Sequence, residues 1–103
     1  MYARMVKGQI KPGKLDVATR LLENDVIPLL KKQHGFRDEV TFFTEGVDEG
    51  FAISFWDTKD DLDRYEREIY PQIRDKMTGL FEDQPMARKF EVSNSTWYHI
   101  HAT

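Results

Sequence analysis

The chain of 103 residues contains no cysteine. This absence excludes a disulfide-stabilised scaffold, a thiolate nucleophile, an iron–sulfur cluster and any zinc site built on sulfur ligands. No run approaches the roughly 18 apolar residues that a membrane span needs, and the first residues lack the long apolar core of a secretory signal. We therefore expect a cytoplasmic protein with no membrane partner.

The chain also lacks a strong charge of either sign, because 15 basic and 18 acidic side chains give a net charge of −3. Without a basic surface we expect no nucleic-acid partner. The length predicts one domain over residues 1–103, with 97–103 as a C-terminal extension. A domain of this size buries about two-thirds of its extended surface, so a partner that adds interface would stabilise it.

The clearest pattern lies between residues 50 and 80, where a strand with strict alternation runs into a helix. Successive side chains of a strand point to opposite sides. One face of this strand therefore carries Phe51, Ile53 and Phe55, and the other carries Ala52, Ser54 and Trp56. Both faces thus carry aromatic side chains, which a sheet with one wet face should avoid.

The helix after this strand has a marked start and an apolar stripe. Thr58 can cap its N-terminus, and Asp61, three residues on, can reach back. Pro71 predicts a kink or an offset of its second half. The stripe recurs every three or four residues, as a helix of period 3.6 requires, and consists of Leu62, Tyr65, Ile69, Ile73, Met77 and Leu80.

The first third of the chain predicts a strand over residues 2–10 and a helix with an apolar face from Lys14 onward. Pro28 lies inside this helix and predicts a kink or a restart just before it. Gly35 suits the left-handed residue that follows a helix. His34 would then be a cation in the last helical turn.

The remaining segments complete a β-α-β-β-α-β order. Residues 36–44 form a hairpin with the strand that follows, and residues 86–96 form the fourth strand. This order predicts an α+β, ferredoxin-like fold, with a four-stranded antiparallel sheet and both helices on one face. A second copy could cover the bare face through two-fold symmetry, so we expect a homodimer.

Four short features at turns and helix ends resemble those of the dimeric α/β-barrel superfamily, and within it those of the antibiotic biosynthesis monooxygenase (ABM)-like group. They are Lys11-Pro12-Gly13-Lys14, Pro28, Gly35-Phe36 and Phe55-Trp56-Asp57-Thr58. The resemblance runs from the first strand to the fourth and implies a dimeric α/β barrel. The group includes oxygenases that use no metal or flavin on quinol-like substrates, haem-degrading enzymes, and small proteins without established activity.

The resemblance thus implies a monooxygenase without a cofactor that acts on an aromatic or quinol-like substrate. The alternative is a non-catalytic homodimer of the same fold with a ligand-binding or structural role. Haem-degrading members carry an asparagine in strand one, a tryptophan in helix two and an iron-ligating histidine further along that helix. The matching positions here are Val6, Tyr65 and Asp75, so haem degradation is disfavoured.

Four residues are candidates for contact with a flat aromatic substrate: Trp56, Tyr65, Tyr70 and His99. The Trp56 indole can stack on a ring while its N–H donates, although apolar periodicity more often indicates core packing. Tyr65 and Tyr70 could orient a phenolic substrate, and packing with a satisfied hydroxyl is again the alternative. No residue stands out as the general base that proton-transfer catalysis requires.

His99 and His101 would share a strand face, which is a two-ligand metal arrangement. No third ligand is spaced to complete it, so we expect no metal. The tail is interpreted as a surface strand or flexible end, or alternatively as residues 97–100 pairing with the second subunit.

Charged residues on the expected strands and at the second helix have simple explanations. Arg4, Lys7, Arg37, Arg88 and Lys89 could hold an anionic substrate, but edge charges that discourage aggregation are the preferred interpretation. The acidic residues Asp57, Asp60, Asp61 and Asp63 suit a helix N-terminus better than a calcium site.

One observation separates the functional hypotheses, namely the space between the second helix and the sheet. A pocket of roughly 300 Å³ or more with a few converging polar groups favours binding or catalysis. A space filled by the protein's own aromatic side chains favours a structural protein.

Overall fold

Four strands form one antiparallel sheet in the order β2-β3-β1-β4. The computed structural model describes residues 1–44 and 46–97. Its strands are β1 (Tyr2–Gln9), β2 (Phe36–Phe43), β3 (Glu49–Trp56) and β4 (Met86–Glu91). The predicted hairpin of β2 and β3 is confirmed, and β1 lies between β3 and β4.

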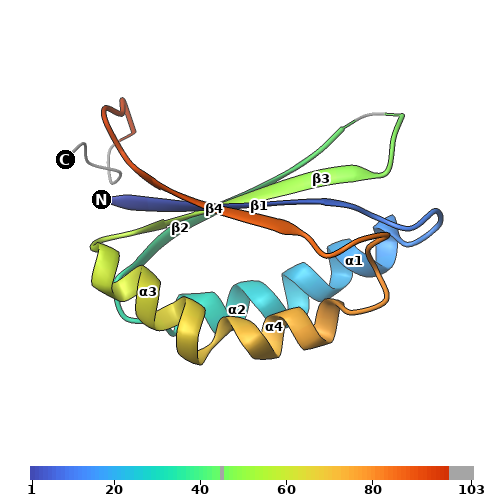
Figure 1. The fold of residues 1–103 in the computed structure, drawn as a ribbon, viewed down its shortest axis with the longest axis horizontal. Coiled ribbons are helices and arrows are strands. Elements are labelled where there is room, and N and C mark those ends of the chain that lie inside the picture. The colour runs from blue at the N-terminus through green and yellow to red at the C-terminus, as the bar shows by residue number, and fades with distance from the viewer. Residues whose placement is uncertain (45, 98–103) are drawn as a thin grey trace.

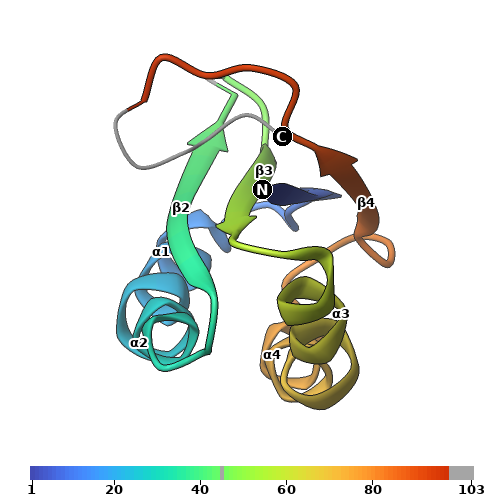
Figure 2. The ribbon, with the colours of Figure 1, turned by 90° about the vertical axis from the view of Figure 1, so that its left-hand side faces the viewer.

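The helices cover one face of this sheet, as Figure 1 shows. They are α1 (Leu15–Leu21), the π-helical turn η1 (Leu22–Val26), α2 (Ile27–Lys31), α3 (Lys59–Glu68) and α4 (Tyr70–Met77). In Figure 2, α1 and α2 lie below β2, whereas α3 and α4 lie below β4. The predicted ferredoxin-like α+β architecture is confirmed. None of the helices in the described part of the chain is long and apolar enough to cross a membrane.

Both prolines interrupt their helices as predicted. Before Pro28 the helix widens into η1, where the N–H of Ile27 donates to the carbonyl of Leu22, five residues back. Before Pro71 the helix breaks at Ile69, whose φ of −114° departs from helical geometry. Proline lacks a backbone donor and clashes with the preceding turn, so a new helical segment begins one residue before each of these prolines, at Ile27 and at Tyr70.

The predicted stripe of the second helix packs into the core. Leu62, Tyr65 and Ile73 are buried there together with Trp56, and Ile69, Tyr70 and Met77 pack against this cluster. The predicted cap is also present: Thr58 Oγ1 accepts from the N–H of Asp61 at 3.1 Å and donates to the Asp61 carboxylate at 2.8 Å. The cap therefore fixes where α3 begins beside the end of β3.

Two local predictions were wrong. β4 ends at Glu91, not at residue 96, because its partner β1 begins at Tyr2, directly opposite Glu91, and the last bond between them runs from the N–H of Val92 to the carbonyl of Met1. His34 lies beyond the end of α2 and is no helix-terminal cation. Its Nδ1 instead contacts Asp61 Oδ1 at 2.8 Å and links the segment after α2 to α3.

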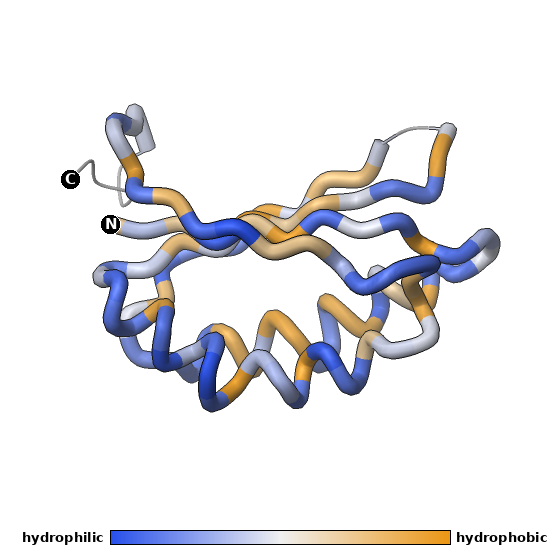
Figure 3. Tube along the Cα trace, in the orientation of Figure 1, coloured by the Kyte–Doolittle hydropathy of each residue, from blue (hydrophilic) through white to orange (hydrophobic). Residues whose placement is uncertain are grey.

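The face of the sheet that the helices leave bare is rich in apolar side chains, although Lys7, Asp38 and Arg88 also lie on it. Phe42 and Phe51 stack there with ring centroids 4.9 Å apart, and Trp97 lies edge-on to Phe55 at 5.6 Å. Figure 3 shows hydrophobic segments in the strands as well as along the helices. Both predicted faces of β3 thus carry aromatic side chains, as the alternation required.

Candidate functional site

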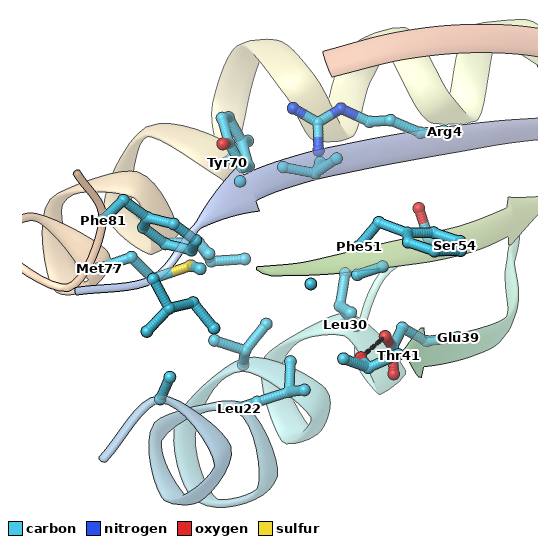
Figure 4. Close-up of a pocket in the computed structure, with 18 of the residues that line it drawn as sticks. Arg4, Leu22, Leu30, Glu39, Thr41, Phe51, Ser54, Tyr70, Met77 and Phe81 are labelled. Carbon is cyan, nitrogen blue, oxygen red and sulfur yellow. Dashed lines mark hydrogen bonds between the residues drawn. The ribbon is translucent and has the colours of Figure 1, made fainter. Parts of the chain in front are cut away.

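A cavity of about 110 Å³ lies between the sheet and the two groups of helices, α1 to α2 and α3 to α4. Most of its wall is apolar, and the helices contribute to it through residues such as Leu22, Val26, Leu30, Ile73 and Met77. Its polar groups are Arg4, Glu39, Thr41, Ser54, Tyr65 and Tyr70. In Figure 4, Arg4 and Tyr70 lie on one side of the space, and Glu39 and Thr41 lie on the other.

Strand register explains why these polar groups meet. Residues directly opposite in an antiparallel pair point to the same side of the sheet. Arg4 lies opposite Ser54 on β3 and opposite Lys89 on β4, while Ser54 also lies opposite Glu39 on β2. One polar row, Glu39–Ser54–Arg4–Lys89, therefore crosses all four strands beneath the helices.

Small side chains beside this row leave the space open. The next row of the same face pairs Thr41 with Ala52 and Val6, and the row after it pairs Phe43 with Gly50 and Gly8. A Cβ at Gly50 would lie 2.7 Å from the Phe43 ring, and one at Gly8 would lie 2.6 Å from the Phe81 ring. The cavity thus lies over small side chains and glycine backbone, with Phe43 and Phe81 at its glycine end.

Arg4 is a buried cation within a network of ion pairs. Its Nε donates to Glu66 Oε2 at 2.7 Å, and Lys89 Nζ contacts the other Glu66 oxygen at 2.9 Å. Burial alone would raise the pKa of Glu66, but the hydrogen bonds from Arg4 and Lys89 hold that pKa below its usual value. The interpretation of Arg4 as an edge charge was wrong, because β1 is a central strand.

Glu39 is a titratable carboxyl group in the cavity wall that the sequence analysis did not single out. Burial raises the pKa of its carboxyl, although a hydrogen bond donated by Thr41 Oγ1 opposes the shift. A carboxylate at a cavity wall with a raised pKa can accept a proton from a bound molecule. The one signal was its place two residues before Thr41, which puts both side chains on the same face of the strand.

Tyr65 and Tyr70 line the cavity, as a substrate-contacting role requires. Burial raises the pKa of Tyr65 far above the usual value of a phenol, so this group stays neutral. The guanidinium of Arg4 lies over the Tyr70 ring, with Cζ 3.9 Å from the ring centroid. Their contact with a ligand remains a prediction.

Trp56 does not line the cavity itself but packs against residues that do. Its side chain is fully buried, stacks on Tyr65 at 4.7 Å and donates from Nε1 to Ser54 Oγ at 2.9 Å. The packing alternative of the sequence analysis thus describes its surroundings, and direct contact with a ligand remains a prediction. His99 lies outside the described residues.

The other candidate groups lie away from the cavity. Asp61 accepts from His34, Thr58 and Arg64, and Asp63 contacts Lys59 and Lys89. Burial would raise the pKa of Asp61, but the hydrogen bonds from His34 and Thr58 lower it overall. Over residues 1–44 and 46–97, no three His, Asp or Glu side chains are grouped to hold a metal ion.

Solved structures with this fold include a monooxygenase of Streptomyces coelicolor in complex with the ligand nanaomycin D. That chain is 14% identical, with 86% of this chain and 84% of that one aligned at a TM-score of 0.72. An antibiotic biosynthesis monooxygenase is 13% identical over 89% and 98% of the two chains, with a TM-score of 0.73. A Nitrosomonas europaea protein of unknown function is 15% identical over 93% and 92%, with a TM-score of 0.77.

The sequence matches no protein-family model and no curated protein. At identities of this size, likeness to solved structures establishes the fold. The predicted resemblance to ABM-like structures is therefore confirmed at the level of the fold, which both monooxygenases and a protein of unknown function share.

Proposed function

We propose that the protein is a cytoplasmic, homodimeric monooxygenase that oxidises a small quinol-like aromatic molecule without a metal or flavin. The observation that carries the proposal is the cavity, which is apolar except for the converging groups of the polar row. Support also comes from the fold, which it shares with a monooxygenase in complex with nanaomycin D.

The volume limits the size of the substrate. About 110 Å³ is below the roughly 300 Å³ expected of a drug-sized ligand site. It is of the same order as an apolar cavity of about 150 Å³ that admits benzene in an engineered protein. The proposed substrate therefore has a single aromatic ring.

The chemistry needs an electron-rich substrate and a proton acceptor. A dihydroquinone and O₂ would give a hydroxyquinone and water: one oxygen atom enters the ring, the other leaves as water, and the substrate supplies all four electrons. Glu39 accepts a hydroxyl proton, because its raised pKa brings it closer to that of a ring hydroxyl. The phenolate that results is more easily oxidised than the neutral phenol.

Oxygen uptake with benzene-1,4-diol, measured above the protein-free rate, tests this proposal. We expect Glu39→Gln to lower turnover by about 10²–10⁴-fold, as loss of a general base does. Calorimetric binding of 4-methoxyphenol should stay within about twofold of wild type. Glu23→Gln, an exposed carboxylate on η1, is the matched control. Wild-type turnover in Glu39→Gln would disprove the role of Glu39.

A second candidate function also has support from the volume. A cavity of only about 110 Å³ suits a non-catalytic homodimer, in which the space holds a small ligand or is a packing defect. Binding of 4-methoxyphenol without oxygen uptake would favour a binding protein. Neither binding nor uptake would favour a structural one.

The homodimer rests on the bare apolar face, which a second copy would cover. We propose that the tail beyond Trp97 crosses to the partner in that dimer. Deletion of residues 97–103 should then weaken the dimer, as measured by mass in solution. An unchanged dimer of unchanged stability would show that the tail makes no such contact.

A further inference from the structure

A guanidinium forms part of the wall of the cavity. The side chain of Arg4 is 4% exposed and lies on the central strand β1. Arginine does not lose its proton in proteins, so this positive charge remains beside the cavity at any ordinary pH. A buried charge is costly unless it is paired, so its surroundings indicate what else the cavity accommodates.

Glu66, the carboxylate that pairs with Arg4, is shared with a second cation. Its Oε2 accepts from Arg4, and its Oε1 contacts Lys89. The pairing of Arg4 within this network is therefore divided between two cations. An anion near Arg4 would therefore be stabilised.

The orientation of Arg4 leaves donors for such an anion. Glu66 uses only Nε, while the two Nη groups carry the remaining four of the five N–H donors of arginine. Among the described residues, no hydrogen bond from either Nη is found. Neither Nη is a fully buried atom that lacks a hydrogen-bond partner. They therefore face accessible space, and Arg4 lines the cavity.

Tyr70 holds the guanidinium in this position. The Arg4 Cζ lies 3.9 Å from the centroid of the Tyr70 ring, so the cation contacts the ring on one side and is hydrogen-bonded to Glu66 through Nε. In Figure 4 the guanidinium lies beside Tyr70, across the cavity from Glu39 and Thr41. A group fixed in this way is preorganised for one ligand atom.

We propose that Arg4 determines the class of ligand that the cavity binds: the Nη groups receive the oxygen of an aromatic phenolate. This proposal rests on the proposed function, since it names the charge state of the same single-ring substrate. Charge-assisted hydrogen bonds to Arg4 favour the phenolate over the neutral phenol. Arg4 is thus the residue that selects a ring bearing an ionisable hydroxyl over a ring without one.

The other titratable groups near Arg4 are consistent with this role. They are Tyr65 and Glu66 from α3, Tyr70 from α4, Lys89 from β4 and Glu39 from β2. Glu66 is held ionised by its two cations, and Tyr65 is held neutral by burial. Glu39 lies on the opposite wall, so the hydroxyl group whose proton it accepts is the one at the other end of the diol ring from the oxygen that Arg4 binds.

The probe for this proposal is 4-nitrophenol, because its phenolate absorbs visible light and its phenol does not. We expect the wild-type protein to bind the phenolate at least about tenfold more tightly than the phenol, a common effect of hydrogen bonds from a charged donor. The pKa of the bound probe would then fall by at least about one unit. The uncharged isostere 4-nitrotoluene should bind at least about tenfold more weakly than the phenolate.

Variants assign the effect to Arg4. Arg4→Met should abolish the pKa shift and leave binding of 4-nitrotoluene within about threefold of wild type. Arg74→Met makes the same change on α4, away from the cavity lining, and should retain the full shift. If Arg4→Met does not fold, the wild-type comparison of 4-nitrophenolate with 4-nitrotoluene still decides the question.

The outcomes separate this inference from the proposed function. Binding of 4-nitrophenol with an unchanged pKa, or equal binding of 4-nitrotoluene, would overturn the role of Arg4 and leave a binding cavity. A shift that persists in Arg4→Met would also overturn it. Failure of the wild-type protein to bind either probe would overturn the proposed function together with the inference.

Discussion

Each face of the sheet carries some side chains that a lone subunit would be expected to place on the other face. The face beneath the helices carries the polar row Glu39–Ser54–Arg4–Lys89. The face without helices carries stacked aromatic rings, among them Phe42, which is 45% exposed. A monomer in water would gain stability from the opposite arrangement.

The difference indicates two separate requirements on the sheet. Apolar side chains on an uncovered face are stabilised when a second protein surface removes them from water. Polar side chains on a covered face are costly unless they are paired, and most of the polar row is paired. The bare face is thus suited to association, and the covered face to chemistry.

The largest expected effect tests the bare face. Ile53 lies near its centre, paired with Met5 and Val40 on the neighbouring strands. Ile53→Glu would bury an unpaired carboxylate in the proposed interface, and we expect the dissociation constant of the dimer to rise at least about 1000-fold. Analytical ultracentrifugation measures this change. Val47→Glu, at the exposed hairpin tip, is the control and should leave the dimer intact.

A smaller effect tests packing on the covered face. Leu62 is fully buried beside Trp56 and Tyr65. Leu62→Ala should lower the free energy of unfolding by about 2–5 kcal/mol, as measured by denaturant titration, because it leaves a void in the core. Val17→Ala, at an exposed helical position, should change that free energy by less than about 0.5 kcal/mol. Similar losses in both variants would contradict the location of the core.

The smallest effect is a pH dependence that comes from the covered face. The folded-state pKa of Glu66 is lowered, so its contribution to stability is present above the ordinary carboxyl pKa and is lost as the pH falls through the lowered value. The folded-state pKa of Glu39 is raised, so its contribution is full below the ordinary value and is lost as the pH rises through the raised one.

Denaturant unfolding from about pH 2 to about pH 8 measures both signs. Glu66→Gln should cost most stability at the upper end of this range. Glu39→Gln should gain stability relative to wild type as the pH rises. Phe42→Leu, on the bare face, should shift stability equally at every pH, and a pH-dependent shift in that variant would break the contrast between the faces.

Most of the fold was predictable because the sequence expresses it through local patterns. Alternation in β3, the stripe of α3 and α4, the cap at Thr58 and the glycine at residue 35 each depend on neighbours in the chain. The end of β4 was not predictable from alternation alone. It depends on the register with β1, whose first residue Tyr2 lies opposite Glu91, and alternation within one strand does not contain that register.

The site was less predictable because it depends on strand order and register. Arg4 and Glu39 are 35 positions apart, and only the order β2-β3-β1-β4 brings both to the same row with Ser54. From the sequence alone, a basic residue in a strand is interpreted as a charge at the edge of the sheet, because the position of the strand in the sheet is not known. Trp56 attracted attention as the largest ring, yet its size is what places it in the core.

The π-helical turn η1 has a consequence for how this cavity can change over evolutionary time. A hydrogen bond that spans five residues encloses one residue more than an α-helical bond does, so η1 behaves as a tolerated one-residue insertion. Elsewhere in a helix, a change of length by one residue rotates every later side chain by about 100°. Within η1, which supplies Leu22 and Val26 to the wall, loss of a residue can be absorbed by closing the turn. The cavity wall can thus change shape to fit a different aromatic ring while α2 stays packed on the sheet.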